Sequence, residues 1–199
     1  YLPEDQGFDY NFAGFDFGQP PSYYAPYTSD WAPGGIPSIM PLSGDEYLTD
    51  REAEEAVRFI RANRKHPFFL NLWHYAVHTP IEAENDKVEK YKKLRQKDAK
   101  HRNPRYAGLV EHLDDSVGQV LQAIEDNGLA DNTIVIFFSD NGGANYSGIT
   151  SNYPLREGKV TQYLGGVRVP MFVYWPGVTT SNSICDVPAI GHDFYPTIL

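Results

Sequence analysis

Two adjacent polar residues, Asp140 and Asn141, follow a short apolar run and precede two glycines, Gly142 and Gly143. The run, residues 133–138, is rich in Ile, Val and Phe, which is typical of a strand buried on both faces of a parallel sheet. A carboxylate and an amide carbonyl at the end of such a strand offer hard oxygen ligands to a divalent cation. Asp, Asn and Gly are also ordinary turn residues, so an Asx-type turn that only closes the strand is the alternative.

A histidine and a lysine complete the set of side chains that could act at one place. His78 follows the apolar run 67–75, and Lys159 lies in a long irregular stretch, residues 144–166, beyond the strand that ends at Asp140. If the strands are neighbours in one sheet, these groups meet at its carboxyl edge. A cation, a lysine and a histidine around one spot would neutralise an oxyanion and donate a proton to a leaving oxygen. Taken singly, His78 could be a packing residue and Lys159 a surface lysine.

Three strand-like runs separated by helical patterns predict an α/β domain with a largely parallel central sheet. The runs cover residues 67–75, 133–138 and 167–175. Residues 1–44 are rich in Gly, Pro and aromatics without a lasting period, which predicts an irregular loop region packed on the core. Its aromatic side chains could line a carbohydrate pocket, but the favoured interpretation is that they attach the loop to the core.

Helices must hold these strands in place. A continuous apolar stripe predicts a long helix over residues 104–127. A second helix is predicted before Pro67, introduced by capping boxes that begin at Ser43 and Thr49. The highly charged segment 82–102 is predicted to be a surface helix with a solvated face and no chemistry.

The composition is that of an ordinary folded domain and argues against several partners. The chain has 199 residues, 41% of them hydrophobic and 22% charged, with a formal net charge of −9. Such an acidic balance argues against a nucleic-acid backbone as the main partner, and no apolar run approaches a membrane span. The single cysteine, Cys185, excludes an internal disulfide framework. The chain begins and ends in the middle of local patterns, so we expect it to be a fragment of a longer protein.

Several motifs, in order along the chain, resemble those of the sulfatase family over about residues 6–199. They are His78-Thr-Pro after the run 67–70, the helical segment 106–118, the strand and turn 132–143, the loop 154–159, and the stretches 163–170, 175–177, 186–188 and 193–199. The family is arylsulfatase-like, formylglycine-dependent and part of the alkaline phosphatase superfamily. The resemblance implies an alkaline-phosphatase-like α/β/α sandwich, here incomplete.

The resemblance also implies an activity and a role for each candidate residue. Sulfate esters, with sugar sulfates as the default, would be hydrolysed at a site that holds Ca²⁺ or Mg²⁺. By position, Asp140 and Asn141 would be metal ligands. Lys159 would contact the sulfate and help the leaving oxygen depart, and His78 would hydrogen-bond the sulfate or protonate the leaving group. With that role assigned to His78, His74 is interpreted as a packing histidine.

Parts of the family's site have no counterpart here. The family's nucleophile is a formylglycine made from Cys or Ser in a Cys/Ser-x-Pro/Ala-x-Arg motif, whereas Cys185 is followed by Asp-Val-Pro and lies too late. The paired aspartates that complete the metal site and the carboxyl-terminal subdomain are also missing. We therefore expect residues 1–199 to be a partial catalytic domain without turnover of its own. The resemblance to the family also implies a periplasmic or secreted protein.

Two other functions remain open. Phosphodiesterases and phosphonate hydrolases share the fold but use Thr or Ser nucleophiles and two metals; the Lys159 loop and the single Asp-Asn pair favour a sulfatase. A degenerate, non-catalytic member would instead bind sulfated glycans through Lys159, Arg156 and the amino-terminal aromatics.

Overall fold

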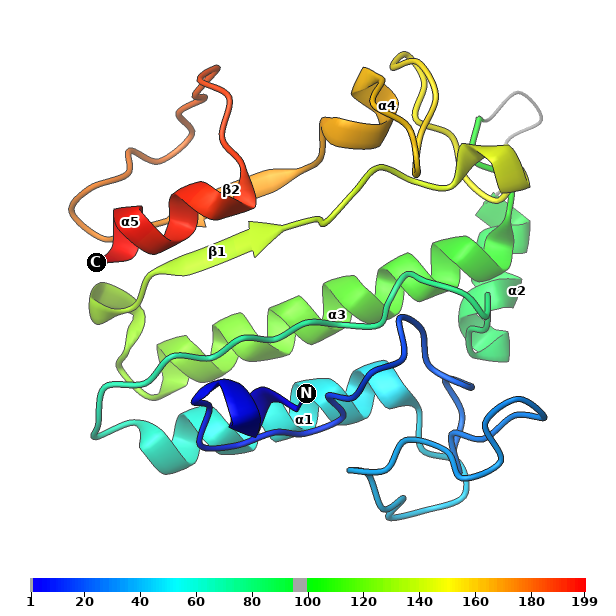
Figure 1. Cartoon of the computed structure of the whole chain (residues 1–199), viewed down its shortest axis with the longest axis horizontal. Coiled ribbons are helices and arrows are strands. Elements are labelled where there is room, and N and C mark those ends of the chain that lie inside the picture. Colours follow the sequence, from blue (N-terminus) through cyan, green and yellow to red (C-terminus); the bar gives the residue numbers. More distant parts are fainter. Residues whose placement is uncertain (1, 95–99) are drawn as a thin grey trace.

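Two long helices and a two-stranded sheet form the frame of the chain in the computed structural model, which describes residues 2–94 and 100–199. Figure 1 shows α3 (Pro104–Asp126) lying between α1 (Leu48–Asn63) and the strands β1 (Val135–Phe138) and β2 (Met171–Tyr174). The shorter elements are η1 (Pro3–Gln6), α2 (Asn85–Leu94), η2 (Ala130–Asn132), η3 (Asn145–Ser147), α4 (Leu164–Val167), η4 (Gly191–Asp193) and α5 (Phe194–Ile198). None of the helices in the described ranges is both long and apolar enough to cross a membrane.

The long helix α3 matches its prediction to within one residue, because its signals are local. Asn103 caps it by accepting hydrogen bonds from backbone N–H groups of the first turn. Its buried face carries the apolar residues Leu109 and Ile124, as the stripe predicts. The same face also buries two polar residues, His112 and Ser116.

Helix α1 is present, but the predicted capping boxes are wrong. Tyr47 occupies the N-cap position and makes no side-chain capping bond. The two glutamates of the predicted boxes bind elsewhere. Glu46 accepts a hydrogen bond from the Tyr27 hydroxyl at 2.6 Å, and Glu52 Oε2 lies 3.0 Å from His74 Nδ1. Tertiary partners therefore take the carboxylates that the local pattern assigned to the helix end.

The charged segment 82–102 forms a helix only in part. Helix α2 covers Asn85–Leu94, residues 95–99 lie outside the described ranges, and residues 100–103 are not helical. Its charges are not all solvated, because Lys87 Nζ lies 3.3 Å from Glu111 Oε1 on α3. The charged face therefore contributes to docking α2 on α3.

The two strands pair antiparallel, so the described residues do not confirm the predicted parallel sheet. Backbone hydrogen bonds continue beyond the strands, from Ser139 N to Pro170 O at 3.2 Å and from Gly142 N to Gly166 O at 2.9 Å. The connecting loop therefore closes on itself and the chain reverses direction. A parallel pair would need a crossover connection that runs back along the sheet.

Residues 67–75 run in an extended conformation but pair with no strand in the described part of the chain. Phe68 and Leu70 pack on the core between α1 and α3. Phe69 and Trp73, which alternate with them, are 65% and 81% exposed. The predicted strand is therefore unpaired and is buried on one face only, because α1 and α3 cover a single side of the segment.

Residues 2–44, the described part of the aromatic-rich region, are mostly irregular, as predicted, and their aromatics mainly attach them to the core. Tyr23 and Tyr27 are fully buried, and the Tyr23 ring stacks on Tyr47 at 5.7 Å. Trp31 remains half exposed. The buried tyrosines thus hold the amino-terminal segment against the turn that follows residue 75.

Candidate active site

The side chains of His78 and Lys159 meet although the two residues are 81 positions apart: Lys159 Nζ donates to His78 Nε2 at 2.8 Å. His78 lies in a turn at the end of the extended segment, where its N–H donates to Tyr75 O at 2.8 Å. The Tyr23 hydroxyl donates to His78 O at 3.1 Å. Burial raises the pKa of Tyr23, so this phenol keeps the proton that it donates. The fold thus brings together the two residues that the sequence proposed for catalysis.

The loop that carries Lys159 is folded back on the turn that follows β1. The Lys159 N–H donates to Gly143 O at 3.1 Å. Asn152 binds Gly143 in both directions, since Nδ2 donates to Gly143 O at 2.8 Å and Oδ1 accepts from Gly143 N at 3.0 Å. Asn152 Nδ2 also donates to Glu157 O at 3.0 Å. No sequence motif singled out Asn152, because its partners are backbone groups that only the folded loop brings near.

The glycines of this turn allow backbone segments to approach more closely than any side chain would permit. A Cβ atom on Gly142 would lie 1.7 Å from Gly165 O, and one on Gly158 would lie 2.2 Å from Gly143 O. Only glycine fits such positions. These close approaches hold the Lys159 loop onto the end of β1.

Asp140 and Asn141 follow β1 at the same turn. Asp140 Oδ1 accepts the Asn141 N–H at 2.8 Å, and Asn141 Nδ2 donates to Gly142 O at 3.0 Å. Each bond reaches only the next residue, so neither is the bond to a backbone group two residues on that defines an Asx turn. Within residues 2–94 and 100–199, nothing donates a hydrogen bond to Asp140 Oδ2 or Asn141 Oδ1. These oxygens fit Ca²⁺ or Mg²⁺ in type, but Ca²⁺ takes about six to eight oxygen ligands, so they can supply only part of such a site.

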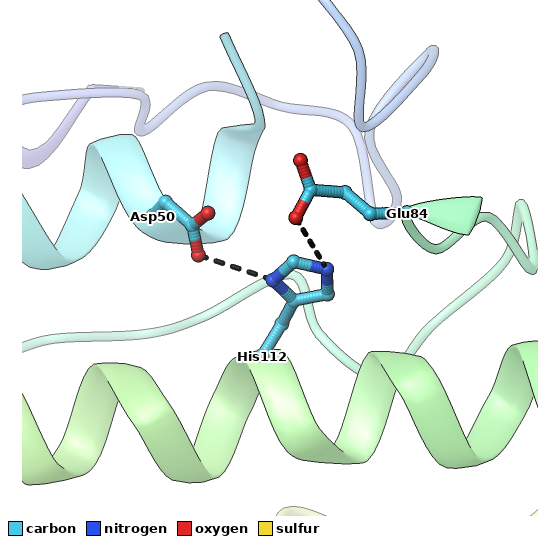
Figure 2. Close-up of side chains that lie close together, drawn as sticks. All are labelled: Asp50, Glu84 and His112. Atoms are coloured by element: carbon cyan, nitrogen blue, oxygen red, sulfur yellow. Dashed lines mark hydrogen bonds and ion pairs between the residues drawn. The ribbon is translucent and has the colours of Figure 1, made fainter. Parts of the chain in front are cut away.

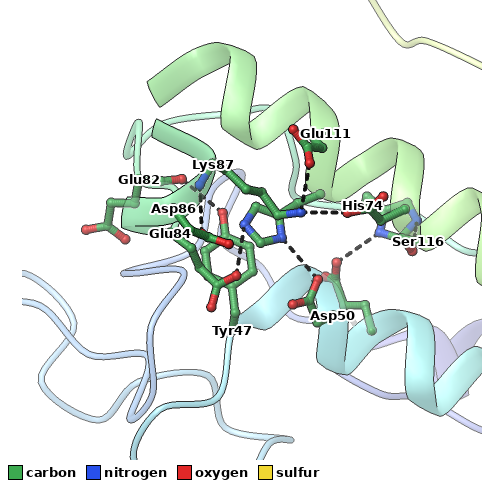
Figure 3. Close-up of polar contacts among 12 residues, drawn as sticks. Tyr47, Asp50, His74, Glu82, Glu84, Asp86, Lys87, Glu111 and Ser116 are labelled. Atoms are coloured by element: carbon green, nitrogen blue, oxygen red, sulfur yellow. Dashed lines mark hydrogen bonds and ion pairs between the residues drawn. The ribbon is translucent and has the colours of Figure 1, made fainter. Parts of the chain in front are cut away.

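His74 lies apart from this turn, in a buried polar network between α1 and α3 (Figure 3). Its Nδ1 lies 3.0 Å from Glu52 Oε2, and its Nε2 lies 3.3 Å from Ser116 Oγ. The side chain is only 9% exposed. This agrees with the interpretation of His74 as a packing histidine.

A buried histidine that no motif indicated, His112 on α3, lies between two carboxylates (Figure 2). Its Nδ1 lies 3.1 Å from Asp50 Oδ1, and its Nε2 lies 3.7 Å from Glu84 Oε2. Its ring stacks on Tyr47 at 3.9 Å. One ligand atom each of Asp50, Glu84 and His112 lies within 4.8 Å of the others, which is close enough for a metal ion. As observed, however, the two carboxylates face different ring nitrogens, and the three side chains bridge α1, α3 and the segment before α2. The sequence signal for the burial of His112 was its position on the apolar stripe of α3.

Two further polar candidates lie on exposed segments. The Arg156 guanidinium stacks over the Tyr163 ring at 3.8 Å, within the loop of Lys159. Cys185 is exposed and lies between β2 and α5. The residues that follow it, Asp-Val-Pro, lack the arginine of the formylglycine motif.

Comparison with known proteins identifies relatives along nearly the whole chain. The Sulfatase family model matches residues 2–199. A sulfatase of Formosa agariphila is 43% identical over 164 residues, covering 77% of this chain and 29% of the relative. The human N-acetylgalactosamine-6-sulfatase is 34% identical over 191 residues, covering 86% of this chain and 35% of the relative. The crystal structure of Ps i-CgsB in complex with k-i-k-neocarrahexaose matches with a TM-score of 0.68 and 36% identity, covering 88% of this chain and 41% of that one.

The chain spans about a third of the length of these curated relatives. The matched residues include the His78 turn, the strand before Asp140 and the loop of Lys159. The structural match covers 88% of this chain, although the described residues form only a small antiparallel sheet. On these grounds the chain belongs to the sulfatase family.

Proposed function

We propose that the intact protein containing this chain hydrolyses sulfate esters, and that residues 1–199 form part of its catalytic domain. The observation that carries the proposal is the 2.8 Å contact between Lys159 Nζ and His78 Nε2. Folding places a cation and an imidazole together from distant parts of the chain, as the stabilisation of an oxyanion requires. Family membership supplies the class of ester.

Lys159 is the proposed sulfate-binding and leaving-group residue. An ammonium group has only N–H donors, and in the described structure Lys159 uses one of them for His78. The remaining donors are available to a sulfate oxygen and to the ester oxygen. As a nucleophile that the described residues do not supply bonds to sulfur, the S–O bond breaks and its electron pair passes to the ester oxygen. A Lys159 N–H proton would then form the new O–H bond and leave a neutral amine. His78 would orient the ammonium group through its Nε2 lone pair.

Asp140 and Asn141 are the proposed ligands of a Ca²⁺ or Mg²⁺ ion. When bound, such an ion polarises the sulfate oxygens and offsets their charge. The nucleophile is a different matter, because the described residues contain no Cys or Ser that fits the formylglycine motif, and we assign no step to Cys185. The 199-residue chain alone is therefore expected to show no turnover.

Sugar sulfates are the proposed substrate class, and a periplasmic or secreted location is proposed with them. One relative is named an N-acetylgalactosamine-6-sulfatase, and the structural neighbour was crystallised with k-i-k-neocarrahexaose. Both names point to carbohydrate.

The test compares hydrolysis of 4-nitrophenyl sulfate, a sulfated disaccharide and 4-nitrophenyl phosphate by the intact protein supplied with Ca²⁺ or Mg²⁺. We expect both sulfate esters to be hydrolysed with a higher kcat/KM than the phosphate. A preference for the phosphate would indicate a phosphodiesterase of the same superfamily. Binding of sulfated glycans without hydrolysis would indicate a non-catalytic member.

A further inference from the structure

Both ring nitrogens of His78 have polar neighbours: Nε2 contacts Lys159, and Nδ1 contacts Thr79. His78 Nδ1 lies 3.1 Å from Thr79 Oγ1 and 3.4 Å from Thr79 O. The Thr79 hydroxyl in turn donates to Gln19 Oε1 at 2.9 Å. Together with the Lys159 contact, these bonds form a chain from Gln19 through Thr79 and His78 to Lys159.

The donors and acceptors of this chain are consistent with one arrangement of protons. Lys159 Nζ offers only donors, so His78 Nε2 must be the acceptor and carries no proton. The Thr79 hydroxyl proton is used by Gln19, so Thr79 Oγ1 presents a lone pair to His78 Nδ1. The Thr79 carbonyl can only accept, and it faces the same nitrogen. Both ends therefore place the single ring proton of His78 on Nδ1.

Gln19 occupies a position that the fold holds firmly. The next residue, Pro20, is fully buried, and so is Tyr23. The backbone N–H of Tyr23 donates to Glu82 Oε2 at 2.8 Å, and the Ser22 hydroxyl donates to the same oxygen at 2.9 Å. The amino-terminal segment is thus fastened along the turn that contains His78 and Thr79, and the Gln19 amide is presented to Thr79 by this packing.

We propose that Thr79 and Gln19 are positioning residues that hold His78 as the Nδ1–H tautomer, so that its Nε2 lone pair orients Lys159. This inference rests on the proposed sulfatase function for its effect on turnover. In the opposite tautomer, Nε2 of His78 would carry the proton and point it at the Lys159 ammonium group, which also has only N–H donors. The two donors would repel each other, and Lys159 would move away. Loss of the Thr79 hydroxyl removes the closer of the two acceptors that favour the observed tautomer.

The test uses Thr79→Val, Thr79→Ser and Gln19→Met in the intact protein. Thr79→Val and Gln19→Met should lower kcat roughly tenfold to hundredfold, because a small displacement of a catalytic group has an effect of this size. KM should rise as well, since Lys159 is also the proposed sulfate contact. Thr79→Ser keeps the hydroxyl and should restore most of kcat. Thr150→Val is the matched control, because it removes a different Thr–His contact, 3.4 Å from His101 Nδ1.

The tautomer is read directly by NMR of ¹⁵N-histidine-labelled intact protein, with His78→Gln used to assign the signals. We expect a protonated Nδ1 and an unprotonated Nε2 in the wild type, and a mixture of tautomers in Thr79→Val. A wild-type Nε2–H tautomer, or an unchanged kcat and tautomer in Thr79→Val, would overturn the inference. If the wild type has the expected tautomer and Thr79→Val shifts it, but no sulfate ester is hydrolysed, the positioning stands and the sulfatase function fails.

Discussion

Asn152 and Gly143 are joined by two hydrogen bonds, one in each direction, between a side-chain amide and a backbone peptide group. The same Gly143 carbonyl accepts the N–H of Lys159 at 3.1 Å. Asn152 is therefore the residue that fastens the lysine loop to the end of β1. The position of the proposed sulfate-binding ammonium depends on a side chain that makes no contact with the imidazole.

Replacing Asn152 with alanine should loosen this loop. The Gly143 N–H loses its partner, whereas the Gly143 carbonyl keeps the N–H groups of Asn145 and Lys159, and the exposed Glu157 carbonyl can bind water instead. An unsatisfied buried group costs about 1–3 kcal/mol. We expect a lower free energy of unfolding by denaturant titration and a clear fall in kcat. Asn63→Ala is the control, because it removes an Asn side-chain bond to Phe59 O at the end of α1. Asn152→Ala with wild-type kcat would show that the loop does not depend on this side chain.

Removing the Lys159 ammonium should impair turnover far more than stability. Deleting a group that stabilises a developing oxyanion typically lowers kcat by about 10²–10³. Lys159→Ala in the intact protein should show this loss with 4-nitrophenyl sulfate as substrate. Lys65→Ala, at an exposed position just beyond α1, is the matched charge deletion and should be neutral. Equal activity of both variants would remove Lys159 from the site.

Removing either oxygen ligand after β1 should weaken cation binding. Asp140→Ala and Asn141→Ala each delete one proposed ligand of Ca²⁺ or Mg²⁺, and the aspartate change also deletes a negative charge. Calorimetric titration of the chelator-treated intact protein should give a higher Kd for both variants, with the larger rise for Asp140→Ala. Asp131→Ala, an exposed acidic control in η2, should leave the Kd unchanged. Wild-type affinity in Asp140→Ala would contradict the ligand assignment.

Acid should weaken the contact between α2 and α3. Burial alone raises the pKa of Glu111, but hydrogen bonds from Lys90, Tyr91 and Lys87 outweigh burial and lower the pKa below its ordinary value of 4.5. A carboxylate with a lowered folded pKa contributes stability that is complete above the unfolded pKa and is lost as pH falls through the folded one.

The unfolding free energy of the wild type should therefore decline as pH drops below about 4.5, the ordinary value of Glu111. Glu111→Gln should be less stable near neutral pH and should show a smaller decline, because the linked proton uptake is gone. Denaturant titrations of both proteins at several pH values measure this difference. Parallel pH profiles for the two proteins would show that Glu111 does not contribute.

Several features follow from the sequence because their causes are local. Helix α3 has its own cap in Asn103 and a long apolar stripe, so its limits could be predicted to within one residue. The turn after β1 has a local signal in the consecutive Asp, Asn and Gly residues 140–143. The close approach of Gly142 to Gly165 is a tertiary contact that only the fold shows. The types and order of His78, Lys159 and the Asp140–Asn141 pair sufficed to propose their chemistry. The series of motifs along residues 6–199 suggested the sulfatase family.

Other features were decided only by tertiary contacts. The antiparallel pairing of β1 with β2 depends on how the long loop closes, and no periodicity encodes that closure. The tautomer of His78 depends on Gln19, which is 60 residues from Thr79 in the chain and becomes its partner only through packing of the amino-terminal segment. His112 is buried between two carboxylates from other elements. A hydrogen-bond partner from a distant segment cannot be predicted from the local sequence. Residue types therefore indicated the chemistry, and the fold determined which atoms meet.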